Sequence, residues 1–486
     1  MLDPRSTMSN FAEITAFRSS ICICLGVKAI YKTTMSLQKK HERATMYQLS
    51  LVILCSFVLV LTSSTTGMAK PKTSAKYSII RSENLKKTKE TLILPYTFAS
   101  DSMGTTLGVG ALAKGYFQDQ LLISGTVFGS FDDARGFIAG LWDLRVPYTK
   151  RLFFTGYGSY GHFPRQKAYS SQQRPPSSSG APAGSNDSDK DDYIQTSGED
   201  NWSVLRLEYV LPLGSMQHQA RGRYHLTKGI LTKGASGGDH WNPLTNGISV
   251  ISFAQSNRYQ NYESEKDNTL FGEVHPFQIS YLYNNTDFPP NPSRGSSQWL
   301  SYTYDAFAET KSGDWTFIEF EASKYFDLGP SSSARQRVLA LNFWTGISPS
   351  WETETGIDGT QMVTNKPPFF EGARLGGFNR MRGYPNNRFN DRAVIYTAAE
   401  YRHTLKWNPL KDVSWLKWLK SDWIQIVGFT ESGRVAGEYN DLGRLSDWKV
   451  DAGIGLRAML AGAVVRLDIA RSDEGTTAWV MFGHSF

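Results

Sequence analysis

Residues 234–238 read Gly-Ala-Ser-Gly-Gly, which matches the Gly-x-Ser-x-Gly pattern of a serine nucleophile, and Asp239 and His240 follow at once. Such a serine needs a strand-to-helix elbow and a histidine within reach of its hydroxyl. Here the pattern lies in a glycine-rich turn, and a histidine next to its own aspartate cannot easily reach Ser236 in triad geometry. We interpret the pattern as a chance match and expect no enzyme and no catalytic residue. A hydrolase built on Ser236 and His240 is the weakest of three hypotheses.

A second pattern could bind a metal ion. Asp187, Asp189 and Asp191 are spaced like the first ligands of a calcium loop. However, the sixth position is Asp192 rather than glycine, and the late glutamate that completes such a loop is missing. The cysteines also give no metal site, because all of them precede residue 56: Cys22, Cys24 and Cys55. The sequence therefore predicts no metal and no cofactor.

The densest group of unusual residues is 367–402, which reads PPFFEGARLGGFNRMRGYPNNRFNDRAVIYTAAEYR. Most of it lies in a stretch of more than 40 residues, between 345 and 392, that is rich in Gly, Asn and Arg. Loops of that length without secondary structure are usually functional or disordered. We expect a functional loop, which the flanking elements must position.

Those elements are predicted to be β-strands. Aromatic residues make up 13% of the chain, there are 43 glycines, and the mean hydropathy of −0.36 with a single long apolar run excludes a bundle of membrane helices. Segments of about ten residues alternate in character. In residues 203–211, Leu205 and Leu207 point to one face, and Arg206 and Glu208 to the other.

Alternating strands of this kind occur in a soluble sandwich and in a membrane barrel with a polar lumen. The aromatics near strand ends and the strand length favour the barrel. The last ten residues, 477–486, alternate apolar residues and end on an aromatic, which resembles the carboxyl-terminal signal of outer-membrane barrels, with Phe482 and Phe486 as its key residues. We predict an all-β transmembrane antiparallel barrel over residues 92–486.

The amino-terminal part is predicted to be an export address. The apolar run 49–61 follows basic residues and precedes small ones, so residues 46–69 resemble a signal peptide cut after Ala69. Residues 1–45 are a possible non-native or extended segment, and residues 70–91 are expected to be a flexible polar lead. The net charge is +7, of which residues 1–69 carry +4. The remainder lacks the clustered basic residues of a nucleic-acid-binding protein.

The cluster at 367–402 also supports a family assignment. Its Met381-Arg382-Gly383-Tyr384 and Glu400-Tyr401-Arg402, with the later VGFTESG, DAGIGLR and RLDIA stretches, resemble the BamA/TamA-type outer-membrane insertase and translocase superfamily. The resemblance implies a 16-stranded barrel whose long extracellular loop, residues 351–393 here, folds into the lumen. It also implies that Arg382 pairs there with two inner-wall acids, Glu400 and Glu431. The implied loop lock comprises Met381, Arg382, Gly383, Tyr384, Glu400, Glu431 and Gly433. Gly383 is expected to adopt a backbone conformation closed to other residues.

The resemblance implies a protein of the bacterial outer membrane that assembles or translocates protein or lipid through a weak seam between its first and last strands. Here that seam would join the strand near 105–113 to residues 477–486. The expected partners are outer-membrane lipid and either the assembly machinery or a separate periplasmic protein, because residues 70–91 leave no room for the POTRA modules of larger members. The alternative is a passive channel or structural barrel. The side on which residues 162–202 lie stays open.

Overall fold

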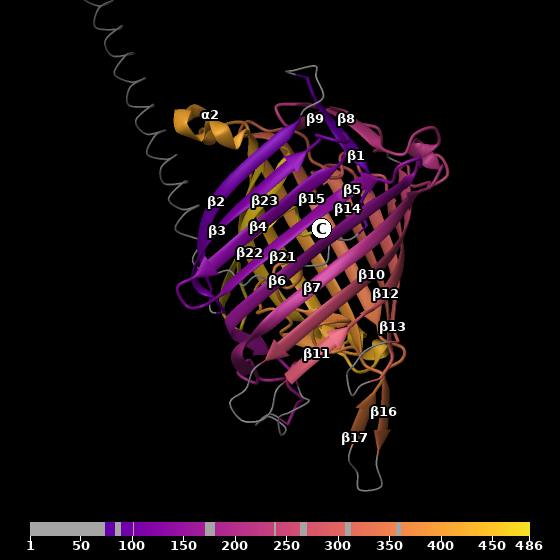
Figure 1. The fold of residues 1–486 in the computed structure, drawn as a ribbon, viewed down its shortest axis with the longest axis vertical. Helices are drawn as coiled ribbons and strands as arrows, with labels where there is room; N and C mark the ends of the chain where they lie inside the picture. Colours follow the sequence, from indigo (N-terminus) through magenta and orange to yellow (C-terminus); the bar gives the residue numbers. More distant parts are fainter. Residues whose placement is uncertain are drawn as a thin grey trace, which may run out of the picture.

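The chain is dominated by one large, barrel-shaped β-sheet (Figure 1). The computed structural model describes residues 73–82, 89–100, 102–170, 180–237, 240–262, 270–306, 313–355 and 361–486. The signal peptide and the segment 1–45 therefore lie outside the described residues. The sheet contains 17 strands: β2 (Glu90–Ser100), β3 (Gly104–Lys114), β4 (Leu122–Ser130), β5 (Arg135–Arg145), β6 (Leu152–Ala168), β7 (Ile194–Val210), β10 (Ile248–Tyr262), β11 (Leu270–Val274), β12 (Phe277–Asn284), β13 (Gly295–Asp305), β14 (Trp315–Asp327), β15 (Ala334–Ile347), β20 (Ala393–Leu405), β21 (Ser421–Ala436), β22 (Lys449–Leu460), β23 (Ala463–Arg471) and β24 (Thr476–Phe482).

Neighbouring strands pair antiparallel in one continuous series from β2 to β24, and β11 and β12 lie one after the other along the same edge of β10. The prediction that the strand at 105–113 borders the last strand is wrong. That strand is β3, which pairs with β2 on one side and β4 on the other. The first strand is instead β2, which contains Pro95, a residue suited to a strand edge. No register joins β2 to β24 among the described residues.

The two faces of the strands differ as the alternation predicts. On β7, Leu205 and Leu207 are 52% and 44% exposed on the outside, whereas Arg206 and Glu208 are buried on the inside. Large apolar side chains are exposed along many other strands in the same way, for example Ile93, Val109, Val127, Phe253, Ile279, Leu300, Phe320 and Ile454. The outer surface of the barrel is therefore suited to a hydrocarbon solvent.

One end of the barrel, which we call the lead end, carries a three-stranded sheet formed by β1 (Tyr77–Arg81), β8 (Gly222–Thr227) and β9 (Ile230–Lys233) (Figure 1). The residues of the polar lead that are described are not a flexible tail, in contrast to the prediction. β1 pairs parallel with β8, and Lys76 is fully buried with its Nζ 2.6 Å from Asp143 and 2.7 Å from Glu208. Ion pairs with these two inner-wall carboxylates hold Lys76, and with it this part of the lead, in place. The polar composition of the lead had instead predicted a lysine exposed to solvent.

The other end, the loop end, carries the segment 348–392 between β15 and β20. It contains two small hairpins, β16 (Glu352–Thr355) with β17 (Gln361–Thr364) and β18 (Ala373–Leu375) with β19 (Phe389–Asp391). The described residues of the segment 162–202, whose side the sequence left open, also lie at this end. Much of this segment extends β6 and β7 rather than forming a solvated insert, and the Gly184 carbonyl accepts a hydrogen bond from the Asn390 amide at 2.7 Å.

The helical elements are short. They are α2 (Pro409–Asp412), η2 (Gly214–Met216), η3 (Ser414–Leu419), η4 (Tyr439–Gly443) and η5 (Leu445–Asp447). Within the described ranges, no helix has both the length and the apolar character needed to cross a membrane.

Candidate functional site

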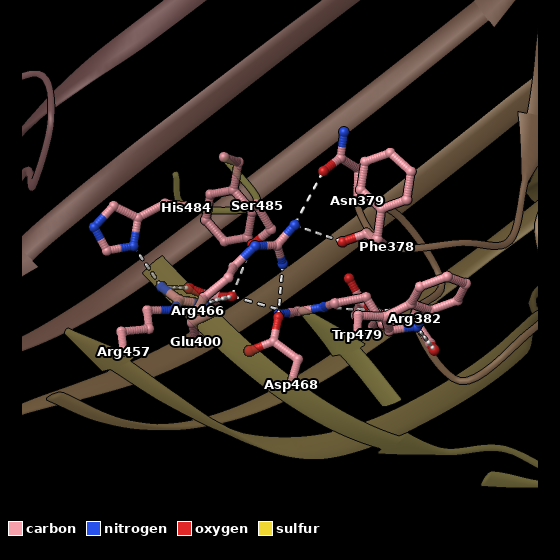
Figure 2. A network of polar contacts seen from close by, with 12 residues as sticks. Phe378, Asn379, Arg382, Glu400, Arg457, Arg466, Asp468, Trp479, His484 and Ser485 are labelled. Carbon is pink, nitrogen blue, oxygen red and sulfur yellow. Dashed lines mark hydrogen bonds and ion pairs between the residues drawn. The ribbon is translucent and has the colours of Figure 1, made fainter. Parts of the chain in front are cut away.

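The later part of the segment 348–392, residues 370–391, turns into the barrel and covers the inner wall of the last strands, whereas the β16–β17 hairpin projects away from the barrel (Figure 1). Its apolar residues join those of β14, β15, β20 and β21 in one buried cluster, to which the loop contributes Phe370, Ala373, Leu375, Met381, Tyr384 and Phe389. Burying these side chains holds the loop in place, since each fully buried large side chain contributes about 1.5–3 kcal/mol. The cluster brings the tip of the loop, Arg382, to the wall formed by β20, β21 and β23 (Figure 2).

Arg382 is fully buried and reaches three carboxylates on three different strands. Its Nη2 donates to Glu400 Oε1 at 3.0 Å, and its Nε lies 3.2 Å from Glu431 Oε2. Its Nη1 donates to Asp468 Oδ2 at 2.7 Å. The structure thus brings together the arginine and both acids of the implied lock and adds a third acid, Asp468 of β23. Charge-assisted bonds of this kind are stronger than neutral ones.

The backbone of Arg382 and the face of its guanidinium group also make contacts with the barrel wall. The Arg382 amide donates to Glu431 at 2.6 Å, and the Arg382 carbonyl accepts from Trp479 Nε1 at 2.7 Å and from the Thr477 hydroxyl. The guanidinium carbon lies 3.5 Å from the centroid of the Phe429 ring, which adds a cation–π contact. Because Thr477 and Trp479 belong to β24, the loop tip is tied directly to the last strand of the barrel.

A wider set of buried charges surrounds this contact (Figure 2). Glu400 also accepts from Arg402 at 2.9 Å and from Arg457 at 2.7 Å, and Asp468 accepts from Arg466 at 2.6 Å. With Glu431, three carboxylates thus bind four arginines on or against the inner wall, all of them at most 2% exposed. Buried charges persist only when they are paired, and each of these groups has at least one partner of opposite charge.

The remaining loop-lock residues occupy defined places. Met381 is fully buried, and its φ of 56° lies in the left-handed region. Gly383 does not have a positive φ, so the expected reason for glycine there is wrong. A Cβ at Gly383 would instead lie 2.6 Å from the Cβ of Asp451, whose Oδ2 accepts from the Gly383 amide at 2.9 Å. Close approach to the wall is therefore what requires glycine.

Tyr384 and Gly433 complete the set. The Tyr384 hydroxyl donates to Asp473 Oδ1 at 2.6 Å, in the turn between β23 and β24. Gly433 of β21 lies beneath the loop, because a Cβ there would come within 3.0 Å of Leu375 Cδ1.

The sequence interpretation missed several members of the network: Asp468, Asp451, Arg402, Arg457, Arg466 and Trp479. The DAGIGLR and RLDIA stretches and Arg402 were already part of the family resemblance, but no role followed from it. Their signal was a charge inside an otherwise apolar alternating strand, which requires an inward-facing partner.

The carboxyl-terminal signal residues lie apart from one another, in contrast to the prediction of one strand over 477–486. β24 ends at Phe482, which is 58% exposed on the barrel surface. The last four residues turn into the barrel, where Phe486 packs against a cluster containing Tyr325 and Val338. Polar bonds hold this tail: Arg457 Nη1 contacts His484 Nδ1 at 2.6 Å, and the Ser485 hydroxyl donates to Glu400 at 2.8 Å.

The two other sequence patterns have ordinary surroundings. The Ser236 hydroxyl donates to the Thr286 carbonyl at 3.0 Å and contacts the Tyr224 hydroxyl, while His240 uses its carbonyl to accept from Asn246 and Asn285. Asp239 lies outside the described residues. Within the described part of the chain, no group of three or more His, Cys, Asp or Glu residues is arranged to hold a metal ion.

Comparison with known proteins gives a family match and a number of similar solved structures, of which three are described. BamA from Haemophilus ducreyi lacking POTRA domains 1–3 is 10% identical with a TM-score of 0.42, covering 82% of this chain and 70% of that one. CdiB from Acinetobacter baumannii is 11% identical with a TM-score of 0.42 (81% and 59% covered), and CdiB from Escherichia coli is 10% identical with a TM-score of 0.46 (81% and 61% covered). This chain thus spans about 60% of each CdiB chain.

No curated protein matches this chain. Residues 245–479 match the Omp85 superfamily domain, and this range includes the loop, Arg382 and the carboxylates that bind it. Residues 245–479 therefore form a domain of the Omp85 superfamily, as their resemblance to BamA/TamA-type barrels implied.

Proposed function

We propose that this protein is a barrel of the bacterial outer membrane that assembles or translocates other molecules, proteins or lipids, without catalysing a reaction. The Arg382 contact carries the proposal. A passive barrel does not require a buried loop arginine that binds three strands and also β24. Such a contact suits a barrel whose interior is held in one of two states.

In the proposed mechanism the loop sets the state of the seam. The sheet closes as a 16-stranded barrel when β11 and β12 count as one interrupted strand, and β2 meets β24 at closure. The Arg382 carbonyl holds Trp479 and Thr477 of β24, so moving the loop tip would alter the strand that borders the seam. In this proposal, loop end and lead end correspond to the outside of the cell and the periplasm.

The partners belong to the proposal as well. We propose that the barrel acts with outer-membrane lipid and with either the assembly machinery or a separate periplasmic protein. The lead end offers a surface for the latter, because β1, β8 and β9 form a small sheet there.

Reconstitution tests the proposal. Phospholipid vesicles containing the protein should fold an added urea-unfolded outer-membrane barrel faster than empty vesicles do, which is read as heat-modifiable mobility on gels. Vesicles with Arg382→Ala should lose most of this acceleration. Equal rates with wild type and with empty vesicles would contradict an assembly role.

A passive channel is the second candidate, and the cavity inside the barrel favours it, since its volume is about 850 Å³. Planar-bilayer recordings separate the two functions. A steady open conductance supports a channel, whereas a low conductance with brief openings that become frequent in Arg382→Ala supports the loop-controlled barrel.

A further inference from the structure

The inner wall of the barrel has two halves of opposite chemistry. The strands β20 to β23 carry the buried charges described above. By contrast, β2 to β5 have charged residues only near their ends: Glu90, Lys114, Arg135, Asp143 and Arg145. Their outward residues are apolar, as membrane strands require, but their inward residues are apolar or small too. This departs from the polar lumen that the sequence led us to expect.

The inward apolar side chains of these strands line the cavity of about 850 Å³, a size within the range of roughly 300–1,000 Å³ for small-molecule sites. The lining residues include Leu94, Leu112, Leu122, Phe128, Ile138 and Trp142. Aromatic side chains of β13, β14 and β15 line it as well, among them Trp299, Phe317 and Trp344. Other lining residues are polar, for example Ser256, Gln278 and Glu319, so the lining as a whole favours an occupant with an apolar and a polar part.

The position of the cavity indicates where that occupant comes from. Leu94 and Tyr96 of β2 and Val480 and Phe482 of β24 all line it, so the cavity borders the two strands that no register joins among the described residues. The outer face beside them is also apolar, with Ile93 of β2 59% exposed. The apolar outer face of β2 and the cavity thus lie on the two sides of the same strand edge.

The lining contains three carboxylates and three guanidinium groups: Glu319, Glu321, Glu371, Arg206, Arg374 and Arg380. Two of the glutamates are paired, Glu321 with Arg380 and Glu371 with Arg258, and Glu319 accepts from Ser301 and Trp344. By contrast, Arg206 of β7, which is 4% exposed, and Arg374 of the loop have no carboxylate oxygen within 4 Å among the described residues, and Arg374 Nη1 donates to Asn387 Oδ1 at 2.9 Å. These two guanidinium groups give the site a charge preference. A phosphate is a matching partner for a buried guanidinium.

We propose that this cavity binds an anionic phospholipid of the surrounding membrane, with its acyl chains against β2 to β5 and its phosphate at Arg206 or Arg374. The inference rests on the proposed function only in requiring that the barrel sits in a membrane. The contact between Arg382 and the wall does not by itself imply any ligand in the barrel interior. A client polypeptide is the competing occupant, but its backbone would need hydrogen-bond partners that this wall does not offer.

Photo-crosslinking tests the proposal. The full chain is reconstituted into vesicles of phosphatidylglycerol that carry a diazirine in the acyl chain, and adducts are mapped to single residues by mass spectrometry. Outward residues such as Leu107 and Phe137 should be labelled, which shows membrane insertion, and inward residues such as Leu112 and Ile138 should be labelled as well. Phosphatidylcholine with the same diazirine should label the inward residues several-fold less.

Gly110 offers a matched pair of variants. A Cβ there would have no neighbour closer than 3.8 Å, so the position has room for a side chain, and it lines the cavity. Gly110→Trp should fill the space and reduce inward labelling about tenfold, while Gly110→Ala leaves it unchanged. Outward labelling should be the same in both variants and serves as the folding control.

The outcomes separate the two proposals. Outward labelling without inward labelling overturns the lipid site and leaves the membrane barrel standing. The absence of both overturns the membrane barrel too. Equal inward labelling by the two phospholipids overturns the anionic preference. If an added unfolded client protein abolishes the inward labelling, the cavity is assigned to the client instead of the lipid.

Discussion

Replacing Arg382 with alanine tests the buried charge network at its centre. The structure shows which carboxylates would be left alone. Glu400 would keep Arg402 and Arg457, and Asp468 would keep Arg466. Among the described residues, Glu431 has no salt bridge except the one to Arg382, so it alone would lose its only cation.

The expected loss of stability follows from the number of carboxylates that lose their only cation. Removing one partner of a buried pair leaves an uncompensated charge and costs about 3–5 kcal/mol. Because two of the three acids stay paired, we expect one such penalty rather than three. That loss corresponds to a shift of roughly two to more than three powers of ten in the unfolding equilibrium.

Urea unfolding of the protein in phospholipid vesicles, followed by tryptophan fluorescence and by heat-modifiable gel mobility, measures this loss. The double variant Arg382→Ala/Glu431→Gln should recover most of it, because no buried charge is then unpaired. Glu431→Gln alone should cost less than Arg382→Ala, since the arginine keeps two acids. An Arg382→Ala protein as stable as wild type would refute the reasoning.

Three further predictions follow from the same contacts. Gly383→Ala should destabilise the protein by about 1–3 kcal/mol in urea unfolding by forcing the loop off the wall, whereas Gly428→Ala, with nothing within 4 Å of its Cβ, should have no effect. Glu400→Gln should cost at least about 3–5 kcal/mol, because it weakens the bonds of three buried arginines, and it should make the carboxyl-terminal tail accessible to carboxypeptidase. Burial alone would lower the pKa of Lys76, but its two carboxylate partners outweigh this effect and raise the pKa above 10.5. The contribution of Lys76 to stability is therefore present below about pH 10.5 and is lost as the pH rises through the higher folded-state pKa. Protease protection of residues 73–82 should accordingly be equal at about pH 7 and pH 9 and fall only above about pH 10.5, and protection that fails by pH 9 would contradict the buried ion pair.

The sequence predicted those parts of the site that are local or carried by the resemblance. Alternation along 203–211 placed Leu205 outside and Arg206 inside, because a strand has a fixed period of two. The order of Arg382, Glu400 and Glu431 along the chain matched the family pattern, and the structure places the Arg382 guanidinium within 3.2 Å of a carboxylate oxygen of each acid.

What the sequence could not predict depends on long-range pairing. Asp468 reaches Arg382 only because β23 lies on the same wall as β20 and β21, and the spacing of 86 residues between them carries no such information. Lys76 could not be placed without knowing that β1 pairs with β8, more than 140 residues away. Residues 477–486 were predicted to form one alternating strand, but the strand ends at Phe482 and the tail turns to meet Glu400.

Hydrogen exchange in membrane vesicles tests the central claim, that the loop tip is held against the inner wall, without changing a residue. The amides of Arg382, Gly383 and Tyr384 are all hydrogen-bonded, to Glu431, Asp451 and the Met381 carbonyl. These three amides should exchange as slowly as those of the strands β20 and β21. Exchange at the rate of a free peptide would contradict the account.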